Sequence, residues 1–192
     1  MQLCFATNNS NKLKELQQLV GNSIHLKSLK EIGSFDDIPE TGTTLRANSL
    51  EKATFIKSKF NINCFADDTG LEVDSLNGEP GVYSARYAGE PANSINNMEL
   101  LLKNLGDNTN RTARFRTVIT LLIDNDAPIY FEGSAEGEIT LTQSGKAGFG
   151  YDPIFIPKGF SRTFAEMTAE EKNGISHRAK AVGKLVNYLN TL

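Results

Sequence analysis

The stretch NCFADDTG, residues 63–70, decides the fold class of this sequence, because a short apolar run leads directly into polar residues. Residues 62–66 are predicted to form a buried strand that ends at a polar turn, residues 67–70. The start of the chain repeats this order, with a predicted buried strand at residues 3–6 and a polar loop at residues 7–11. Both predicted strands therefore end in polar side chains.

Helices and further strands are predicted around these two strands from the spacing of apolar residues. Residues 43–60 carry an apolar face at helical spacing, and Thr43 and Thr44 offer an N-cap for this helix. Residues 114–123 and 129–141 are rich in Val, Ile, Phe and Thr, which favours a long antiparallel hairpin. Other helices are predicted at residues 13–20, 95–105 and 175–189. The patterns together predict an α/β fold with a mixed sheet.

Length, charge and hydropathy limit the possible classes of function. The 192 residues predict one domain that spans residues 1–192. A net charge of −3 argues against long nucleic acid as a partner, because such binding usually needs an excess of basic residues. No apolar run approaches the roughly 20 residues that span a bilayer, and the start of the sequence lacks the pattern of a signal peptide. We therefore expect a cytoplasmic protein that does not associate with membranes.

The cysteines and histidines give little support for a soft-metal or redox site. Cys4 and Cys64 both lie in short apolar runs, which favours buried, reduced thiols over a disulfide or a catalytic pair. The histidines, His25 and His177, are too far apart for the usual zinc-ligand spacing. Any bound metal is therefore expected to be a hard cation on carboxylates.

A polar loop between a predicted strand and a predicted helix is the first candidate site. It has the sequence TNNSNK and consists of Thr7, Asn8, Asn9, Ser10, Asn11 and Lys12. Free N–H groups at a helix start, small polar side chains and one lysine together suit an anion such as phosphate. The same residues also suit a turn that only caps the helix.

The adjacent carboxylates Asp67 and Asp68 form the second candidate site. Neighbouring carboxylates repel each other unless a cation or hydrogen bonds offset the repulsion, so the pair suits a Mg²⁺ site or a base that activates water. Alternation along a strand points the two side chains in different directions, so only one is expected to act directly. The alternative is a polar turn before Gly70.

Two later segments add an aromatic ring and cations. In GKAGFGYDP, residues 145–153, closely spaced glycines allow a ligand to approach the backbone, and Phe149 or Tyr151 can stack on a base. EEKNGISHR, residues 170–178, gathers Lys172, His177 and Arg178. Each segment also fits a structural role, as a glycine-rich loop with a packed ring or as a solvated helix start. All four candidate sites together supply the groups of a Mg-nucleotide site.

Five motifs, in this order, resemble those of the inosine triphosphate pyrophosphatase family, the Ham/RdgB-type hydrolases of non-standard purine nucleoside triphosphates. The motifs are TNNSNK, ETGTTLRANSLEKA, FADDTGLEVDSLNGEPGVYSARYAG, GFGYDPIF and EEKNGISHR, and the similarity spans nearly the whole chain. The sequence departs from the family pattern at Asn8, Leu45, Ala47, Ser49 and Thr69, where the family usually has Gly, Phe, Glu, Ala and Ser.

This resemblance implies an elongated α/β fold with a long mixed β-sheet, flanking helices and two lobes around a nucleotide-binding cleft, usually in a homodimer. It implies Mg²⁺-dependent hydrolysis of ITP, dITP and XTP to the nucleoside monophosphate and pyrophosphate, which removes these nucleotides from the pool. Two other functions remain open at this point. One is a related hydrolase for modified pyrimidine or methylated nucleotides, and the other is a nucleotide sensor without catalysis.

The resemblance also assigns roles to individual residues. Asp68 is expected to be the catalytic carboxylate and, together with Glu40, a Mg²⁺ ligand. The triphosphate is expected to contact the TNNSNK loop, Lys52 and Lys172. The remaining nucleotide-binding residues are expected to be Thr69, Phe149, Gly150, Tyr151, Asp152, His177 and Arg178. Asp67 ranks lower, as a supporting carboxylate.

Overall fold

A computed structural model describes residues 2–20, 24–124 and 126–192. Its strands are β1 (Gln2–Phe5), β2 (His25–Lys27), β3 (Cys64–Val73), β4 (Pro80–Gly81), β5 (Thr112–Leu122), β6 (Ile129–Ile139) and β7 (Phe155–Pro157). Its helices are α1 (Ser10–Val20), α2 (Leu45–Phe60), α3 (Ser94–Leu105), α4 (Ala169–Ile175) and α5 (His177–Leu189).

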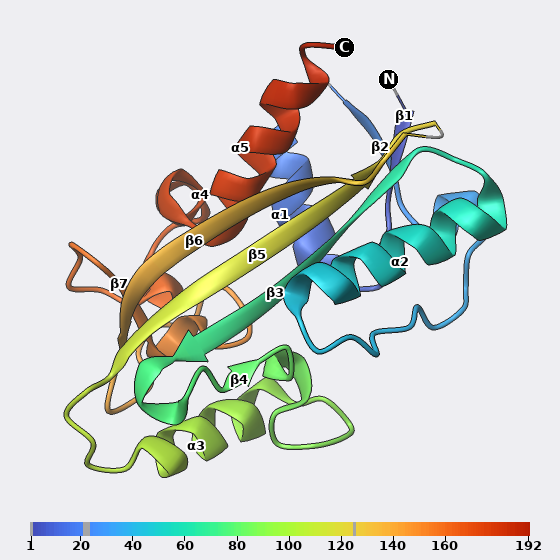
Figure 1. Cartoon of the computed structure of the whole chain (residues 1–192). Helices are drawn as coiled ribbons and strands as arrows, with labels where there is room; N and C mark the ends of the chain where they lie inside the picture. The colour runs from blue at the N-terminus through green and yellow to red at the C-terminus, as the bar shows by residue number, and fades with distance from the viewer. Residues whose placement is uncertain (1, 21–23, 125) are drawn as a thin grey trace. The chain divides into compact units, whose positions relative to one another are not determined.

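The strands form one mixed sheet, which confirms the predicted fold class (Figure 1). The strand order is β2-β1-β3-β5-β6-β7, and β4 pairs with β3 outside this path. β1 runs parallel to both β2 and β3, whereas β3 with β4 and β6 with β7 are antiparallel. β5 and β6 are neighbours in the sheet, as the predicted hairpin requires.

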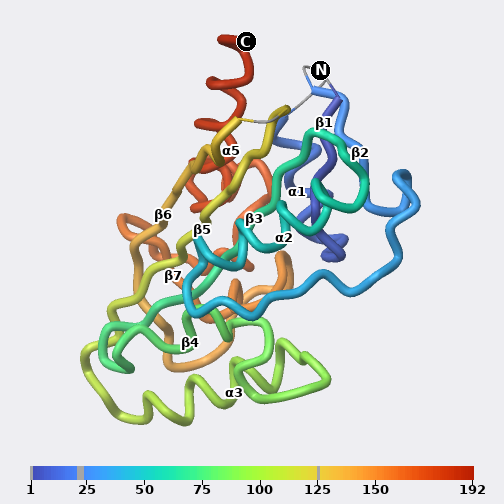
Figure 2. The backbone as a smooth tube through the Cα atoms, turned by 45° about the vertical axis from the view of Figure 1, so that its right-hand side comes forward, coloured from blue at the N-terminus to red at the C-terminus, as the bar shows by residue number. Residues whose placement is uncertain are grey.

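The chain divides into two compact units, and both contain segments that are distant in sequence. The first unit consists of Met1–Asp68, Thr117–Gly133 and Arg178–Leu192, and the second of Thr69–Arg116 and Ser134–His177. The first strand, β1, and the last helix, α5, thus belong to the same unit (Figure 2). Each unit has its own apolar core.

In the first unit, alternation along the strands divides the core between the two faces of the sheet. Leu3, Phe5 and Phe65 pack in one cluster with residues of α1 and α5, and the Phe5 and Phe65 rings stack with their centroids 4.9 Å apart. Residues of the same strands that point the other way, including Cys4 and Cys64, pack with α2. Two layers of helices therefore enclose this part of the sheet, with β3 between them.

The core of the second unit lies between α3, the strands and the segment around β7. Phe115 contacts Phe155 and Phe164, with ring centroids 4.8 and 6.1 Å away. Met98 and Leu101 of α3 belong to the same cluster. The helical spacing predicted for residues 95–105 is therefore confirmed, and it reflects one buried face of α3.

Two predicted element boundaries differ from the structure. β3 was predicted to end before Asp67, but it continues through both carboxylates to Val73. The strand can continue because basic side chains approach each carboxylate from a different face, as described below. The helix predicted at residues 175–189 is α5, but it begins only at His177, because Ser176 is extended (φ −68°, ψ 155°) and ends the preceding helix, α4, which was not predicted. By contrast, Thr44 is the N-cap of α2, as predicted, and accepts a hydrogen bond from the Ala47 N–H at 3.1 Å.

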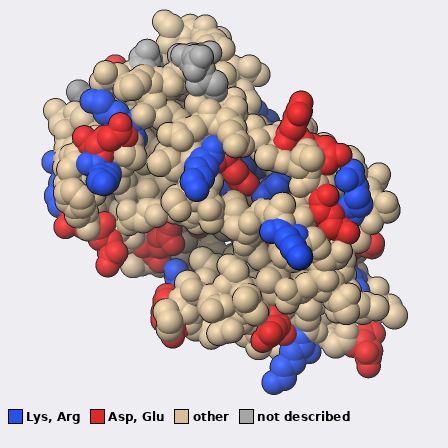
Figure 3. Space-filling model, turned by 180° about the vertical axis from the view of Figure 1, so that it is seen from behind, with Lys and Arg blue, Asp and Glu red and all other residues tan. Residues whose placement is uncertain are grey.

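Among the described residues, no helix is both long and apolar enough to cross a membrane. On the face shown in Figure 3, Lys and Arg side chains are interspersed with Asp and Glu. This mixed pattern agrees with the small net charge of −3.

Candidate active site

Asp68 is held on the α2 side of β3 by two side chains of one helix. Lys52 Nζ lies 3.1 Å from Asp68 Oδ1, and Asn48 Nδ2 donates a hydrogen bond of 3.1 Å to Asp68 Oδ2. Asn48 and Lys52 reach the same carboxylate because residues four positions apart lie on one face of a helix. Lys52 also forms an ion pair with Glu40. Glu40 and Asp68, which were predicted as metal ligands, and Lys52, which was predicted to contact the triphosphate, are thus brought together within the first unit.

The electrostatic environment of Asp68 suits a group that exchanges a proton. Asp68 is only 6% exposed, and burial is the main reason why its pKa is raised above the ordinary value of a carboxyl group. Lys52 and Lys12 oppose this rise, whereas Glu40 adds to it. Burial alone would lower the pKa of Lys52, but the carboxylates of Asp68, Asp67 and Glu40 outweigh it and raise the pKa. Lys52 therefore stays protonated and supplies a fixed positive charge.

The donor set beside Lys52 fits Mg²⁺. Glu40 and Asp68 each place a carboxylate oxygen against the same ammonium group, so one cation can contact both. Mg²⁺ is commonly held by one or two carboxylates together with substrate phosphates. Within the described ranges, no group of three His, Cys, Asp or Glu side chains gathers as a metal site.

Asp67 points to the opposite face of β3, which confirms the predicted divergence of the two carboxylates. Its Oδ1 lies 3.0 Å from Lys12 Nζ, and its Oδ2 lies 3.4 Å from Arg178 Nε. Arg178, which is 2% exposed, also pairs with Glu15 of α1. Burial would raise the pKa of Asp67, but Lys12, Arg178 and Lys52 hold it well below the ordinary value. Asp67 therefore stays ionised and joins β3 to α1 and α5.

The TNNSNK loop follows β1 and leads into α1, as predicted. Asn9 Oδ1 accepts hydrogen bonds from the backbone N–H groups of Asn11 and Lys12, at 3.0 and 3.2 Å. Asn9 N–H in turn bonds to Thr7 Oγ1 at 3.2 Å. The loop thus caps the helix, and the side chains of Asn8, Asn9, Ser10 and Asn11 are exposed. An exposed helix start beside Lys12 retains the features that favour an anion.

The second unit contains another cluster of predicted site residues around Asp152. Lys172 Nζ lies 2.7 Å from Asp152 Oδ2, and the same oxygen accepts a hydrogen bond from Phe149 N–H at 2.8 Å. The Lys172 ammonium also lies 4.9 Å from the centroid of the Phe149 ring. Gly148 has φ +73°, and a Cβ there would lie 2.0 Å from Asp152 Oδ2, so the tight loop requires glycine. Asp152 and Lys172 thus hold Phe149, which is half-buried, in one position.

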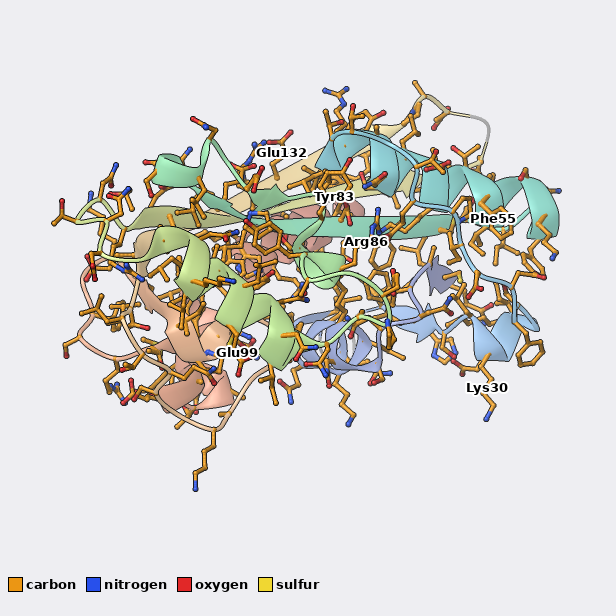
Figure 4. The ribbon with its side chains drawn as sticks, turned by 90° about the horizontal axis from the view of Figure 1, so that it is seen from below. Lys30, Phe55, Tyr83, Arg86, Glu99 and Glu132 are labelled. Atoms are coloured by element: carbon orange, nitrogen blue, oxygen red, sulfur yellow. The ribbon has the colours of Figure 1, made fainter. Side chains whose placement is uncertain are left out.

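The other predicted residues of this unit occupy different environments. His177 is 3% exposed and stacks on Phe115, with ring centroids 4.7 Å apart. Thr69 follows Asp68 in β3 and is half-buried, and Gly150 adopts φ +65°. In the YSARYAG motif, the Arg86 guanidinium lies 5.6 Å from the centroid of the Tyr83 ring, and Figure 4 shows these two side chains near each other.

Tyr151 belongs to the core of the second unit. It is 4% exposed, and its hydroxyl donates a 2.8 Å hydrogen bond to the Ser84 carbonyl. This placement favours a structural role for Tyr151 and leaves Phe149 as the ring that can stack on a base.

Tyr151→Phe is therefore expected to lower the free energy of unfolding by about 1 kcal/mol, because one buried hydrogen bond is lost while the ring is kept. Urea denaturation measures this loss, and KM for the nucleotide should stay within twofold of the parent value. A tenfold rise in KM at unchanged stability would instead place the Tyr151 hydroxyl at the substrate.

Two residues of these clusters were not predicted from the sequence. Asn48 contacts Asp68 and Glu15 contacts Arg178, although neither was assigned a role. The spacing of Asn48 and Lys52 was a usable signal, since it places both on one stripe of a helix. For Glu15 the only signal was its position three residues after Lys12, which also fits an ordinary surface pair.

Comparison with known proteins agrees with these motifs and this fold. The model of the Ham1 family matches residues 3–188. A dITP/XTP pyrophosphatase of Flavobacterium johnsoniae is 54% identical over 189 residues, which cover 98% of both chains. A protein of the same name from Porphyromonas gingivalis is 50% identical over 98% of this chain and 97% of its own.

Solved structures give the same result for the fold. The Ham1 protein of Staphylococcus aureus has a TM-score of 0.91 at 38% identity and covers 100% of this chain and 99% of its own. A HAM1 protein of Coxiella burnetii has a TM-score of 0.92 at 38% identity and covers all of both chains.

Proposed function

Because the chain belongs to the Ham1 family, we propose that it is a nucleoside triphosphate pyrophosphatase that hydrolyses dITP, XTP and ITP to the nucleoside monophosphate and pyrophosphate. The observation that carries this proposal is the buried carboxylate of Asp68, which lies between Lys52 and Asn48 and next to Glu40. A carboxylate with a raised pKa beside a fixed positive charge suits an acid–base role on a phosphate substrate. Relatives named dITP/XTP pyrophosphatase support the choice of substrate.

In the proposed mechanism, Asp68 accepts a proton from the water that attacks the α-phosphorus. The bond from the α-phosphorus to the bridging oxygen then breaks, and pyrophosphate leaves with that oxygen. Lys52 and Lys12 favour the transition state because negative charge grows on the phosphate oxygens. Glu40 and Asp68 would hold Mg²⁺, which when bound neutralises phosphate charge and polarises the phosphoryl group. Asp67 is too weak a base to take part in the proton transfer, because Lys12 and Arg178 hold its pKa well below the ordinary value.

Selection among purines depends on the edge of the base. Hypoxanthine and xanthine carry a 6-oxo group that accepts hydrogen bonds, whereas the 6-amino group of adenine donates them. Donors placed for the oxo group would be left unpaired by adenine, at a cost of about 1–3 kcal/mol each. We therefore propose that ATP is a poor substrate. Phe149, supported by Lys172 and Asp152, is the ring proposed to stack on the base.

The substrate class is tested by comparing kcat/KM for dITP, XTP, ITP, ATP, GTP and CTP in the presence of Mg²⁺. The kcat/KM values for dITP, XTP and ITP should each exceed the value for ATP by at least tenfold, because adenine would lose one or two hydrogen bonds to the site. Comparable values for all six nucleotides, or the highest value with CTP, would contradict it. Tight binding of XTP without turnover would indicate a sensor.

The metal requirement is tested by removing divalent cations with EDTA and then restoring Mg²⁺. Activity is expected to fall to background and to return as Mg²⁺ is added. Full activity without divalent cations would contradict the proposed metal site.

We further propose a cytoplasmic homodimer, and a monomer mass by light scattering at assay concentration would contradict the dimer.

A further inference from the structure

Asn48 is a buried polar residue in the first unit that the mechanism above leaves without a role. Asn48 lies on α2 and is 1% exposed. Nδ2 donates a hydrogen bond of 3.1 Å to Asp68 Oδ2. This is a contact between residues 20 positions apart, so it depends on the packing of α2 against β3. The amide therefore meets the reacting carboxylate rather than a backbone group of its own helix.

The orientation of the Asn48 amide is fixed by chemistry. An ionised carboxylate only accepts hydrogen bonds, so the atom that faces Asp68 must be the NH₂ group and not the oxygen. The oxygen, Oδ1, then points away. Among the described residues it has no hydrogen-bond partner, although it is buried. Gly42 lies against it, since a Cβ at Gly42 would be 2.8 Å from Oδ1.

This arrangement is unfavourable for folding by itself. A buried acceptor without a partner loses its hydrogen bonds to water and gains none in the protein. A leucine of similar volume would avoid that cost, because it fills the same space without a polar atom. What leucine cannot supply is the donor to Asp68 Oδ2. The contact with Asp68 is thus the feature of Asn48 that packing does not require.

We propose that Asn48 is a positioning residue that fixes the carboxylate plane of Asp68. Lys52 holds Oδ1 and Asn48 holds Oδ2, so the carboxylate cannot rotate freely about its Cβ–Cγ bond. A general base must point its lone pair at the water it deprotonates, and small errors of orientation are costly in rate. This inference rests on the proposed function, because it concerns the same site.

The test is Asn48→Leu, with Ser49→Ala as the matched control. Ser49 is the next residue of α2 and is also buried, but its hydroxyl contacts Thr120 Oγ1 at 2.7 Å and the Arg46 carbonyl at 3.0 Å, and not Asp68. For Asn48→Leu, kcat with dITP should fall about 10- to 100-fold while KM stays within twofold, because orientation acts on the chemical step. Its melting temperature should change little, because leucine removes the unpaired Oδ1 acceptor but also the donor to Asp68 Oδ2, and the two effects on stability oppose each other. Ser49→Ala should keep kcat within twofold.

Two further measurements separate positioning from a merely structural role. In the Asp68→Asn background, Asn48→Leu should cause no further loss of rate, because its effect passes through Asp68. Asn48→Asp keeps the shape but replaces the donor with an acceptor, so it should not restore the rate. Unchanged kcat in Asn48→Leu, an additional loss in the double variant, or a loss of kcat matched by a lower melting temperature would each overturn the proposal.

The contact itself can be tested without activity. The side-chain amide of Asn48 in a ¹H–¹⁵N NMR spectrum should shift when Asp68 is replaced by Ala, and should not shift in Ser49→Ala. An unshifted signal in Asp68→Ala would refute the contact. If the parent protein releases no pyrophosphate from any nucleotide, the proposed function and the positioning role both fail, whereas the NMR result still reports the contact.

Discussion

Asp68→Asn is expected to reduce kcat for pyrophosphate release from dITP by about 10²- to 10⁴-fold, the usual contribution of a general base. The amide has nearly the same shape as the carboxylate, and its oxygen can still accept a hydrogen bond from Lys52 or Asn48. It cannot, however, take a proton from water. It also removes one of the two negative charges beside Lys52. The loss should therefore appear in kcat, while the nucleotide still binds.

The matched control is Asp36→Asn in the same unit. Asp36 forms an exposed ion pair with Lys59 and contacts none of the site residues described above. Its kcat should stay within twofold of the parent value. Steady-state kinetics and calorimetric binding of XTP distinguish loss of chemistry from loss of binding. If Asp68→Asn retained a rate within threefold of the parent protein, Asp68 could not be the base.

Asp67→Asn is expected to lower the free energy of unfolding by about 3–5 kcal/mol, because it breaks a buried ion pair next to the proposed catalytic carboxylate. Asp67 is 1% exposed and compensates the charges of Lys12 and Arg178. Without it, the buried Arg178 guanidinium and the partly buried Lys12 ammonium lose a common partner. Urea denaturation at pH 7 measures this loss, and the exposed Asp36→Asn variant should show little change. Stability equal to that of the parent protein would contradict the role of Asp67.

The same ion pair makes the stability depend on pH. The pKa of folded Asp67 lies below that of an unfolded aspartate, about 3.9. As the pH falls, Asp67 is therefore protonated in the unfolded chain before it is protonated in the folded protein. Its contribution to the free energy of unfolding is complete above about pH 4 and is lost as the pH falls further. Without divalent cations, the difference in stability between the parent and Asp67→Asn should thus shrink on going from pH 7 to pH 3. A constant or growing difference would contradict this assignment.

Local patterns predicted much of the fold. The helical spacing and the N-cap at Thr44 are confirmed, and alternation along the strand separates Asp67 from Asp68 as predicted. The end of β3 was placed too early because two adjacent carboxylates resemble a turn when their partners are unknown. Those partners lie far away in sequence, since Arg178 is 111 positions from Asp67. Only the folded sheet brings them together.

The distance in sequence between contacting residues also explains which site residues could be predicted from the sequence. Motif similarity assigned roles to Glu40, Lys52 and Asp68, and the structure places them in one cluster. Asn48 is buried beside Asp68, and Tyr151 is buried in the core of the second unit. Both positions depend on packing between helices, strands and loops that are distant in sequence, which no local pattern encodes. An aromatic residue in a glycine-rich loop is equally compatible with base stacking and with a core position.

The products formed from XTP, followed by ³¹P NMR with Mg²⁺ present, show directly which phosphoanhydride bond is cleaved. XMP and pyrophosphate should form in equal amounts, with no early formation of orthophosphate or XDP. Orthophosphate and XDP as the first products would place cleavage at the terminal phosphate and contradict the proposed reaction.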